Sequence, residues 1–179
     1  MKKQIVFLLF ILFIAKISFA QFYVGADASV AYPIGHLKSQ VDFGYGPKFN
    51  LGYSLNEKLD FSFNYAFLNF KTMQPDFKIM SETLSAKYKF SAKKYNPYLG
   101  VKTGIYHSKV EVPSFFNGQT METSDKKENA FGFAPMAGML INTGNSDNWK
   151  LDISTAYSFL NFKNKYEYLS LSFGVLYLF

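Results

Sequence analysis

The chain of 179 residues contains no cysteine and no arginine, so that all of its 19 basic residues are lysine. Without thiols it can form no disulfide bond, thiolate zinc site, iron–sulfur cluster or cysteine nucleophile. Without arginine it lacks the side chain that nucleic-acid readers use for bidentate contacts to bases and phosphates. We therefore expect no nucleic-acid partner.

Long hydrophobic runs are also scarce. A helical membrane protein needs apolar runs of roughly 20 residues, and the single candidate run, residues 5–15, follows a basic head at the very start of the chain. Ser18 and Ala20 are the small residues expected before a cleavage point. The pattern predicts a signal peptide over residues 1–20, cleaved after Ala20. An uncleaved anchor is the alternative, but the run is short and Lys16 would lie in hydrocarbon.

Aromatic residues, in contrast, are abundant: the chain has 21 Phe and 13 Tyr, yet its mean hydropathy is only −0.03. Beyond residue 20 the apolar and polar residues alternate with period two, which indicates strands with two different faces. The alternation runs through eight segments, which we predict to be strands: 22–31, 43–53, 59–69, 79–90, 97–107, 130–142, 149–159 and 169–179.

The solvent on each face follows from the size of the side chains. Eight strands enclose only enough room for side chains, so the large aromatic set is expected to face lipid and the small or polar set to face inward. On the apolar parity the only charges are Glu82 and Glu167. Short and long connections also alternate, as in bacterial outer-membrane barrels. We therefore predict an all-β fold over residues 21–179: an eight-stranded antiparallel up-and-down transmembrane β-barrel.

The two halves of this predicted barrel resemble each other in order. Residues 43–47 (FGYGP) match 131–135 (FGFAP), and 65–71 (YAFLNFK) match 157–163 (YSFLNFK). We interpret this as an internal duplication of 21–90 and 97–179, with chance similarity among aromatic-rich strands as the alternative. Pro47 and Pro135 lack a ladder donor, so each is predicted to mark a bulge or a local break.

Charged residues on the inward parity are the main candidate site. They are Asp27, Lys48, Asp60, Lys87, Lys102 and Asp152. Because buried charges need partners, we predict a charge network in the lumen. Asp27 and Lys102 hold equivalent places in strands four apart, which face each other across the barrel. A filled interior is favoured over a proton or ion path because eight strands leave so little room.

The last predicted strand has a regular apolar alternation that ends at the final residue. Its members are Leu171, Phe173, Val175, Tyr177 and Phe179. This looks like the C-terminal signature by which outer-membrane barrels are recognised for assembly. With the signal peptide and eight strands, the chain resembles the small outer membrane protein β-barrel domain family of Gram-negative bacteria, with an OmpA/OmpX-like architecture. The resemblance implies insertion by the barrel assembly machinery and residence in the outer membrane, among its lipid and lipopolysaccharide.

Catalytic candidates are weak. His107 and Ser108, with Glu111 nearby, are the ingredients of a lipid A deacylase-like site. However, adjacent residues on a strand point to opposite faces, so we assign no catalytic site and expect no enzyme. The chain has no histidine cluster at metal-ligand spacing and no phosphate-cradling glycine loop, so we predict neither a metal nor a cofactor.

The longest predicted loop, 108–128, is the best place for recognition, since surface loops carry binding residues on a rigid scaffold. It contains the candidates Phe115 and Phe116 and the mixed-charge run 125–128, which we expect to be solvated. The sequence does not identify an extracellular partner. A structural or interaction protein is the favoured function. The alternatives are a lipid A or phospholipid acyl hydrolase that uses His107 and a soluble periplasmic lipid carrier of lipocalin shape.

Overall fold

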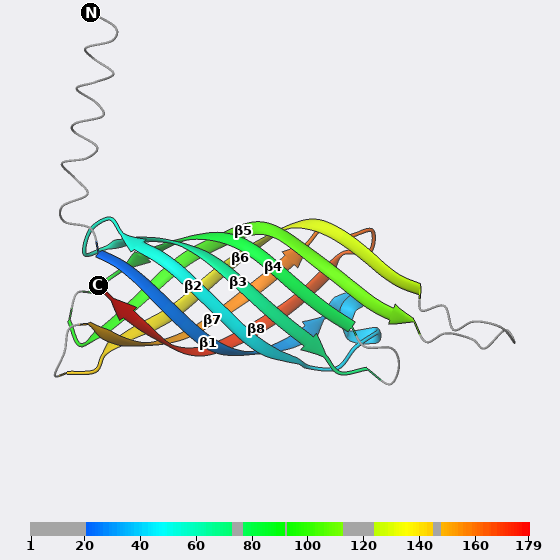
Figure 1. Cartoon of the computed structure of the whole chain (residues 1–179), viewed down its shortest axis with the longest axis horizontal. Helices are drawn as coiled ribbons and strands as arrows, with labels where there is room; N and C mark the ends of the chain where they lie inside the picture. Colours follow the sequence, from blue (N-terminus) through cyan, green and yellow to red (C-terminus); the bar gives the residue numbers. More distant parts are fainter. Residues whose placement is uncertain (1–20, 73–76, 92, 113–123, 145–147) are drawn as a thin grey trace, which may run out of the picture.

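The protein is a closed antiparallel β-barrel, seen in a computed structural model that describes residues 21–72, 77–91, 93–112, 124–144 and 148–179. Each strand pairs with its neighbours in sequence, and β8 pairs back with β1 (Figure 1). The elements are β1 (Gln21–Ile34), η1 (Gly35–Ser39), β2 (Gly44–Ser54), β3 (Leu59–Phe70), β4 (Phe77–Lys89), β5 (Tyr95–Val112), β6 (Ser124–Asn142), β7 (Trp149–Leu160) and β8 (Tyr166–Leu178). The predicted fold class is confirmed. The predicted signal peptide lies outside the described residues.

The two ends of the barrel differ. The turn end carries the C-terminus and the connections 55–58, 90–94 and 143–148, and the loop end carries the other four connections (Figure 1). In the part of the chain that the structure describes, no helix is long and apolar enough to span a membrane.

The predicted loop 108–128 was too long, because β5 and β6 continue well into it. Their ladder extends to the pairs Val110–Lys126 and Val112–Ser124. The charge run 125–128 therefore belongs to β6 and not to a loop. A strand does not need lipid on one of its faces, because hydrogen bonds between neighbouring backbones are enough to continue the ladder. Phe115 and Phe116 lie outside the described residues.

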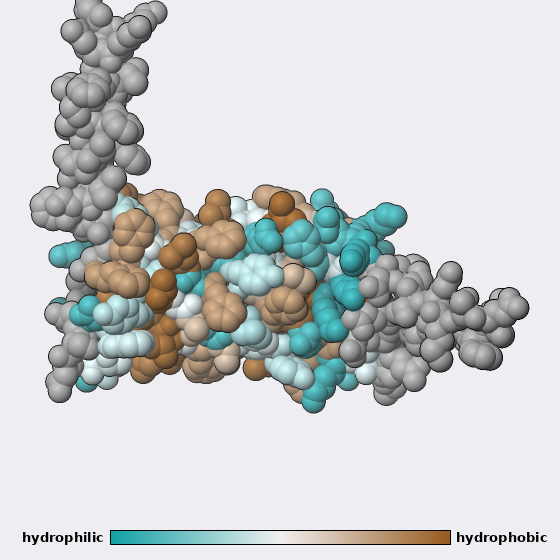
Figure 2. Space-filling model, viewed as in Figure 1, coloured by the Kyte–Doolittle hydropathy of each residue, from teal (hydrophilic) through white to brown (hydrophobic). Residues whose placement is uncertain are grey.

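The outer wall is apolar, as predicted. In β3, for example, Phe61 and Phe63 are exposed, whereas Asp60 and Ser62 are buried. Figure 2 shows apolar and aromatic side chains gathered toward the turn end of the wall and hydrophilic side chains toward the loop end. Because the backbone bonds of a closed barrel are satisfied between strands, such a wall can face hydrocarbon.

Pro47 and Pro135 each break the ladder on one side. The β2–β3 pairing lapses at residues 46–47 and the β6–β7 pairing at 134–135, and in both cases the register is the same before and after the gap. Each proline still pairs with the strand on its other side. Both are therefore local breaks, and neither is a bulge.

The lumen is layered, so the prediction of a polar lumen was incomplete. A loop-end cluster consists of Ala31, Leu37, Val41, Leu68, Phe70, Phe77, Ile79, Tyr106, Ala130, Leu160, Phe162, Tyr166 and Tyr168. A turn-end cluster consists of Tyr23, Tyr98, Ala134, Met136, Leu140, Ala156, Leu176 and Leu178. A layer of buried charged and hydroxyl side chains lies in the same interior.

Aromatic rings fit inside this narrow barrel where a glycine lies next to them. Tyr23 is paired with Gly52 and Tyr98 with Gly138. A Cβ on Gly52 would lie 2.0 Å from the Tyr23 ring, and one on Gly138 would lie 2.5 Å from the Tyr98 ring. Each ring occupies the space that a side chain on the paired glycine would fill.

Candidate functional site

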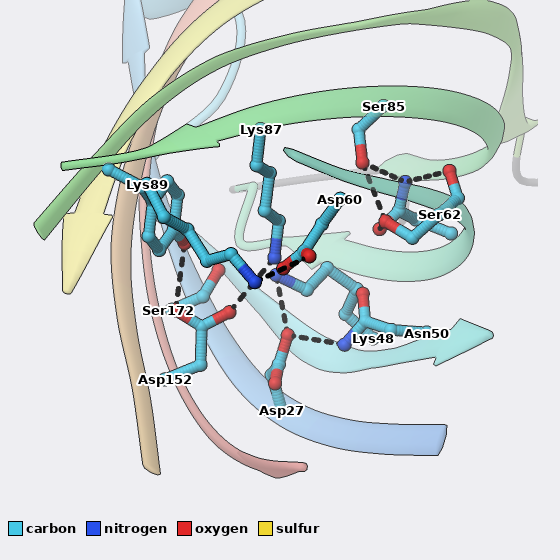
Figure 3. Close-up of polar contacts among 12 residues, drawn as sticks. Asp27, Lys48, Asn50, Asp60, Ser62, Ser85, Lys87, Lys89, Asp152 and Ser172 are labelled. Carbon is cyan, nitrogen blue, oxygen red and sulfur yellow. Dashed lines mark hydrogen bonds and ion pairs between the residues drawn. The ribbon is translucent and has the colours of Figure 1, made fainter. Parts of the chain in front are cut away.

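Three aspartates and three lysines form ion pairs inside the barrel (Figure 3). The pairs are Lys48 Nζ–Asp27 Oδ2 at 2.5 Å, Lys87 Nζ–Asp152 Oδ2 at 3.3 Å and Lys89 Nζ–Asp60 Oδ1 at 2.7 Å. All six residues are buried. Since a buried charge is costly unless it is paired and hydrogen-bonded, each of these pairs keeps two otherwise unfavourable groups in the lumen.

Polar neighbours add hydrogen bonds to two of the aspartates. Asn50 Nδ2 donates to Asp27 Oδ2 at 2.9 Å, and the Tyr98 hydroxyl donates to Asp152 Oδ1 at 2.7 Å. Lys87 Nζ also lies 4.9 Å from the centroid of the Tyr98 ring. Asp152 thus joins a lysine from β4 and a tyrosine from β5 across the lumen.

Hydroxyl side chains extend this polar layer between neighbouring strands. Ser29 Oγ and Ser172 Oγ are 2.8 Å apart, and Ser62 Oγ and Ser85 Oγ are 2.6 Å apart. Asn64 Nδ2 donates to Ser85 Oγ at 3.2 Å. Charged and hydroxyl groups are thus linked by hydrogen bonds between strands, which rigidifies a polar interior.

The structure brings five of the six predicted lumen residues into ion pairs and adds Lys89. Lys89 is two residues from Lys87 and so has the same parity, a signal that could have identified it. The predicted network also included Lys102, which takes no part in these three ion pairs, and Asp27 pairs with Lys48, which lies directly opposite it on the adjacent strand. A neighbour in the ladder is closer than a residue on the far wall.

Lys102 therefore stands apart. It is half-buried, it has no ion pair among the described residues, and Lys48, Lys87 and Asp27 are the charges that act on it. Two of these three charges repel it. The positive charge of Lys102 is therefore the one in the predicted set that no carboxylate pairs with among the described residues.

We expect Lys102→Met to leave the barrel equally stable or to stabilise it by about 1 kcal/mol, because it removes an unpaired, half-buried charge without orphaning a carboxylate. Urea unfolding of the protein in detergent micelles measures the difference. Lys48→Met is the matched control, and it should destabilise, since it leaves Asp27 without its lysine. A large loss of stability in Lys102→Met would show that this lysine has a partner after all.

The catalytic candidates do not meet. β5 continues to Val112, so His107 and Ser108 are consecutive residues of one strand and face opposite sides. Ser108 is buried in the interior and its hydroxyl donates to the Glu128 carbonyl at 3.4 Å. His107 Nδ1 lies 2.8 Å from Asn129 Oδ1. Within the described residues there is also no group of three or more carboxylate or histidine side chains that could hold a metal ion.

The predicted C-terminal signature lies on the outer wall. Leu171, Phe173, Val175 and Phe179 are exposed and Tyr177 is half-buried. The rings of Tyr177 and Phe179 contact edge to face at 5.2 Å, and Trp149 packs on Tyr177 at 5.0 Å. This alternation forms an aromatic border at the turn end of β7 and β8.

A closed barrel with an apolar outer wall and charges paired inside it is a transmembrane β-barrel. The chain belongs to the family of the outer membrane protein beta-barrel domain, which matches residues 5–179. It is an integral protein of the Gram-negative outer membrane.

Solved structures have the same fold. Neisserial surface protein A is 27% identical, with a TM-score of 0.69 over 89% of this chain and 99% of that one. Ail of Yersinia pestis, in complex with the heparin analogue sucrose octasulfate, is 15% identical, with a TM-score of 0.56 over 89% of this chain and 97% of that one. OprG of Pseudomonas aeruginosa is 14% identical, with a TM-score of 0.56 over 90% and 96% of the two chains. No curated protein matches the chain.

Proposed function

We propose that this barrel is a structural or interaction protein with a closed interior, and not an open pore. The observation that carries the proposal is the filled lumen. Tyr23, Tyr98 and Tyr106 are each at most 2% exposed, and Leu37 of η1 is completely buried in the loop-end cluster. Charges that are paired with one another inside the barrel are not available to line an aqueous path.

The proposed partners are those that surround the wall. Outer-membrane lipid and lipopolysaccharide contact the exposed aromatic residues, and the barrel assembly machinery reads the C-terminal alternation during insertion. The loop end displays surfaces for an extracellular partner. Among proteins with this fold, Ail has been crystallised with a heparin analogue, which supports the idea that such a scaffold presents binding surfaces outside its lumen.

Permeability tests the closed interior. We expect liposomes that contain the purified protein to retain small sugars and ions, and planar bilayers to show no conductance steps, because the lumen is filled by side chains. A general porin reconstituted at equal mass is the positive control. Regular conductance steps from the wild-type protein would contradict the proposal.

Neither alternative function is retained. The acyl hydrolase would require His107 to activate Ser108, and the two side chains lie on opposite faces of β5. The soluble carrier would need a lipid cavity within the barrel and a polar exterior. Here the described interior is filled, while large aromatic residues such as Phe131 are more than half exposed on the outer wall.

A further inference from the structure

Lys102 lies in the lumen between the two apolar clusters. On β5 it is halfway between Tyr98, which belongs to the turn-end cluster, and Tyr106, which belongs to the loop-end cluster. Both tyrosines are at most 2% exposed. The lysine therefore occupies the polar layer of the barrel, with a packed layer of apolar side chains on each side of it.

The residues next to Lys102 in the wall have small side chains. Ser85 is directly opposite it on β4 and Ala134 is directly opposite it on β6. Gly100 and Gly104 are its neighbours of the same parity along β5. Lys102 is only half-buried, whereas the three ion-paired lysines are buried. Because its side chain is on the inward parity of a closed barrel, the uncovered part of Lys102 faces the lumen.

The ion pairs leave the charge of Lys102 unbalanced. They join three carboxylates to three lysines, so the paired groups are neutral together and Lys102 adds one positive charge. Lys48 and Lys87 repel it, and Asp27 is the carboxylate that attracts it. An uncompensated charge in the interior of a protein is costly. The position of Lys102 therefore favours a further group of negative charge.

Asp27 does not supply that charge. Its Oδ2 is already bound by Lys48 and Asn50, and its buried Oδ1 has no hydrogen-bond partner among the described residues. This second oxygen lies against β8, at the place where a Cβ on Gly174 would stand. β8 is the neighbour of β1, whereas β5 is four strands away from β1 around the barrel. Asp27 Oδ1 is thus held at one wall, while Lys102 extends from the opposite wall.

We propose that Lys102 binds a small monovalent anion of the halide type inside the barrel. The ammonium group donates to the anion, which supplies the missing negative charge. Lys48 and Lys87, which repel Lys102, attract the anion, so one ion offsets both unfavourable interactions. The packed clusters on either side enclose the ion, which enters as the barrel folds and needs no open path. This site goes beyond the closed interior proposed above and is compatible with it.

Urea unfolding of the purified protein in micelles of a neutral detergent tests the site. Chloride replaces gluconate at constant ionic strength, and gluconate is the reference because a six-carbon anion is too large to be enclosed beside Lys102. At a chloride concentration about ten times its Kd, we expect the unfolding equilibrium constant of the wild type to fall roughly tenfold, as for any ligand that binds only the folded state. Lys102→Met should be equally stable in the two salts.

Lys58→Met is the matched control, because Lys58 is an exposed lysine at the turn end. This variant should keep the full chloride effect of the wild type. An equal chloride effect in Lys102→Met would overturn the proposal, and so would the absence of any effect in the wild type.

Crystals of the wild-type protein grown in sodium bromide give a second measurement that depends on no variant. We expect an anomalous bromide peak inside the barrel, in contact with Lys102 Nζ. A barrel interior without such a peak would overturn the site. Conductance decides the closed lumen separately, since conductance steps would contradict the closed interior without removing an anion bound at Lys102.

Discussion

Asp152→Asn is expected to lower the free energy of unfolding by about 3–5 kcal/mol, since removing one partner of a buried ion pair leaves the other charge uncompensated. Asparagine keeps the shape of the side chain and can still accept from the Tyr98 hydroxyl, which lies 2.7 Å from Asp152 Oδ1. The loss therefore reports the charge of Lys87 and not a cavity. Urea unfolding in lipid vesicles, followed by heat-modified gel mobility, measures it.

The double variant Asp152→Asn/Lys87→Met separates the pair from its surroundings. It removes both charges, so most of the lost stability should return, as when buried ion pairs are replaced by apolar residues. If the double variant were as unstable as Asp152→Asn, the lone lysine could not be the cause. The network would then act through its hydrogen bonds and not through its charges.

Gly46→Ala is expected to destabilise the barrel by about 3 kcal/mol, the upper end of the usual cost of overpacking. A Cβ at Gly46 would lie only 1.8 Å from the carbonyl oxygen of Phe67. That oxygen belongs to the backbone of β3, so it cannot rotate away as a side chain would. The strands must separate where the β2–β3 ladder is already interrupted, and both unfolding and the yield of folded barrel should show it.

Ala134→Gly is the matched control for Gly46→Ala. Ala134 precedes Pro135 as Gly46 precedes Pro47, and there the chain accommodates an alanine with no exposed surface. We expect Ala134→Gly to cost about 1 kcal/mol, from the greater backbone freedom of glycine and a small lost contact. A similar cost in the two variants would mean that the close approach at Phe67 does not limit the fold.

Much of the fold could be predicted because strand periodicity is a local property. Phe61 and Phe63 had to share a face, and Asp60 and Ser62 the other, whatever the rest of the chain did. The narrow interior of eight strands then decided which face meets lipid. The interior rings escaped this reasoning, because Tyr23 and Tyr98 fit only where Gly52 and Gly138 lie beside them. That adjacency depends on the register between strands.

The candidate site was predictable as a set and not as pairs. Asp60 is directly opposite Lys87 in the ladder, yet it pairs with Lys89, while Lys87 reaches Asp152 instead. Lysine side chains are long enough to choose among several carboxylates, so the choice depends on the curvature of the wall and the packing around each ammonium group. No spacing in the sequence reports those quantities.

By itself, the sequence determined which residues share a face: alternation with period two places the aromatic rings on one parity of each strand, and the narrow interior of eight strands directs that face to lipid. Only the tertiary structure decided which charges pair and where rings enter the lumen. The physical reason is the range of the interactions. Strand alternation relates residues that are two positions apart in the sequence. Ion pairs and packed rings, in contrast, join residues that closure of the barrel brings together.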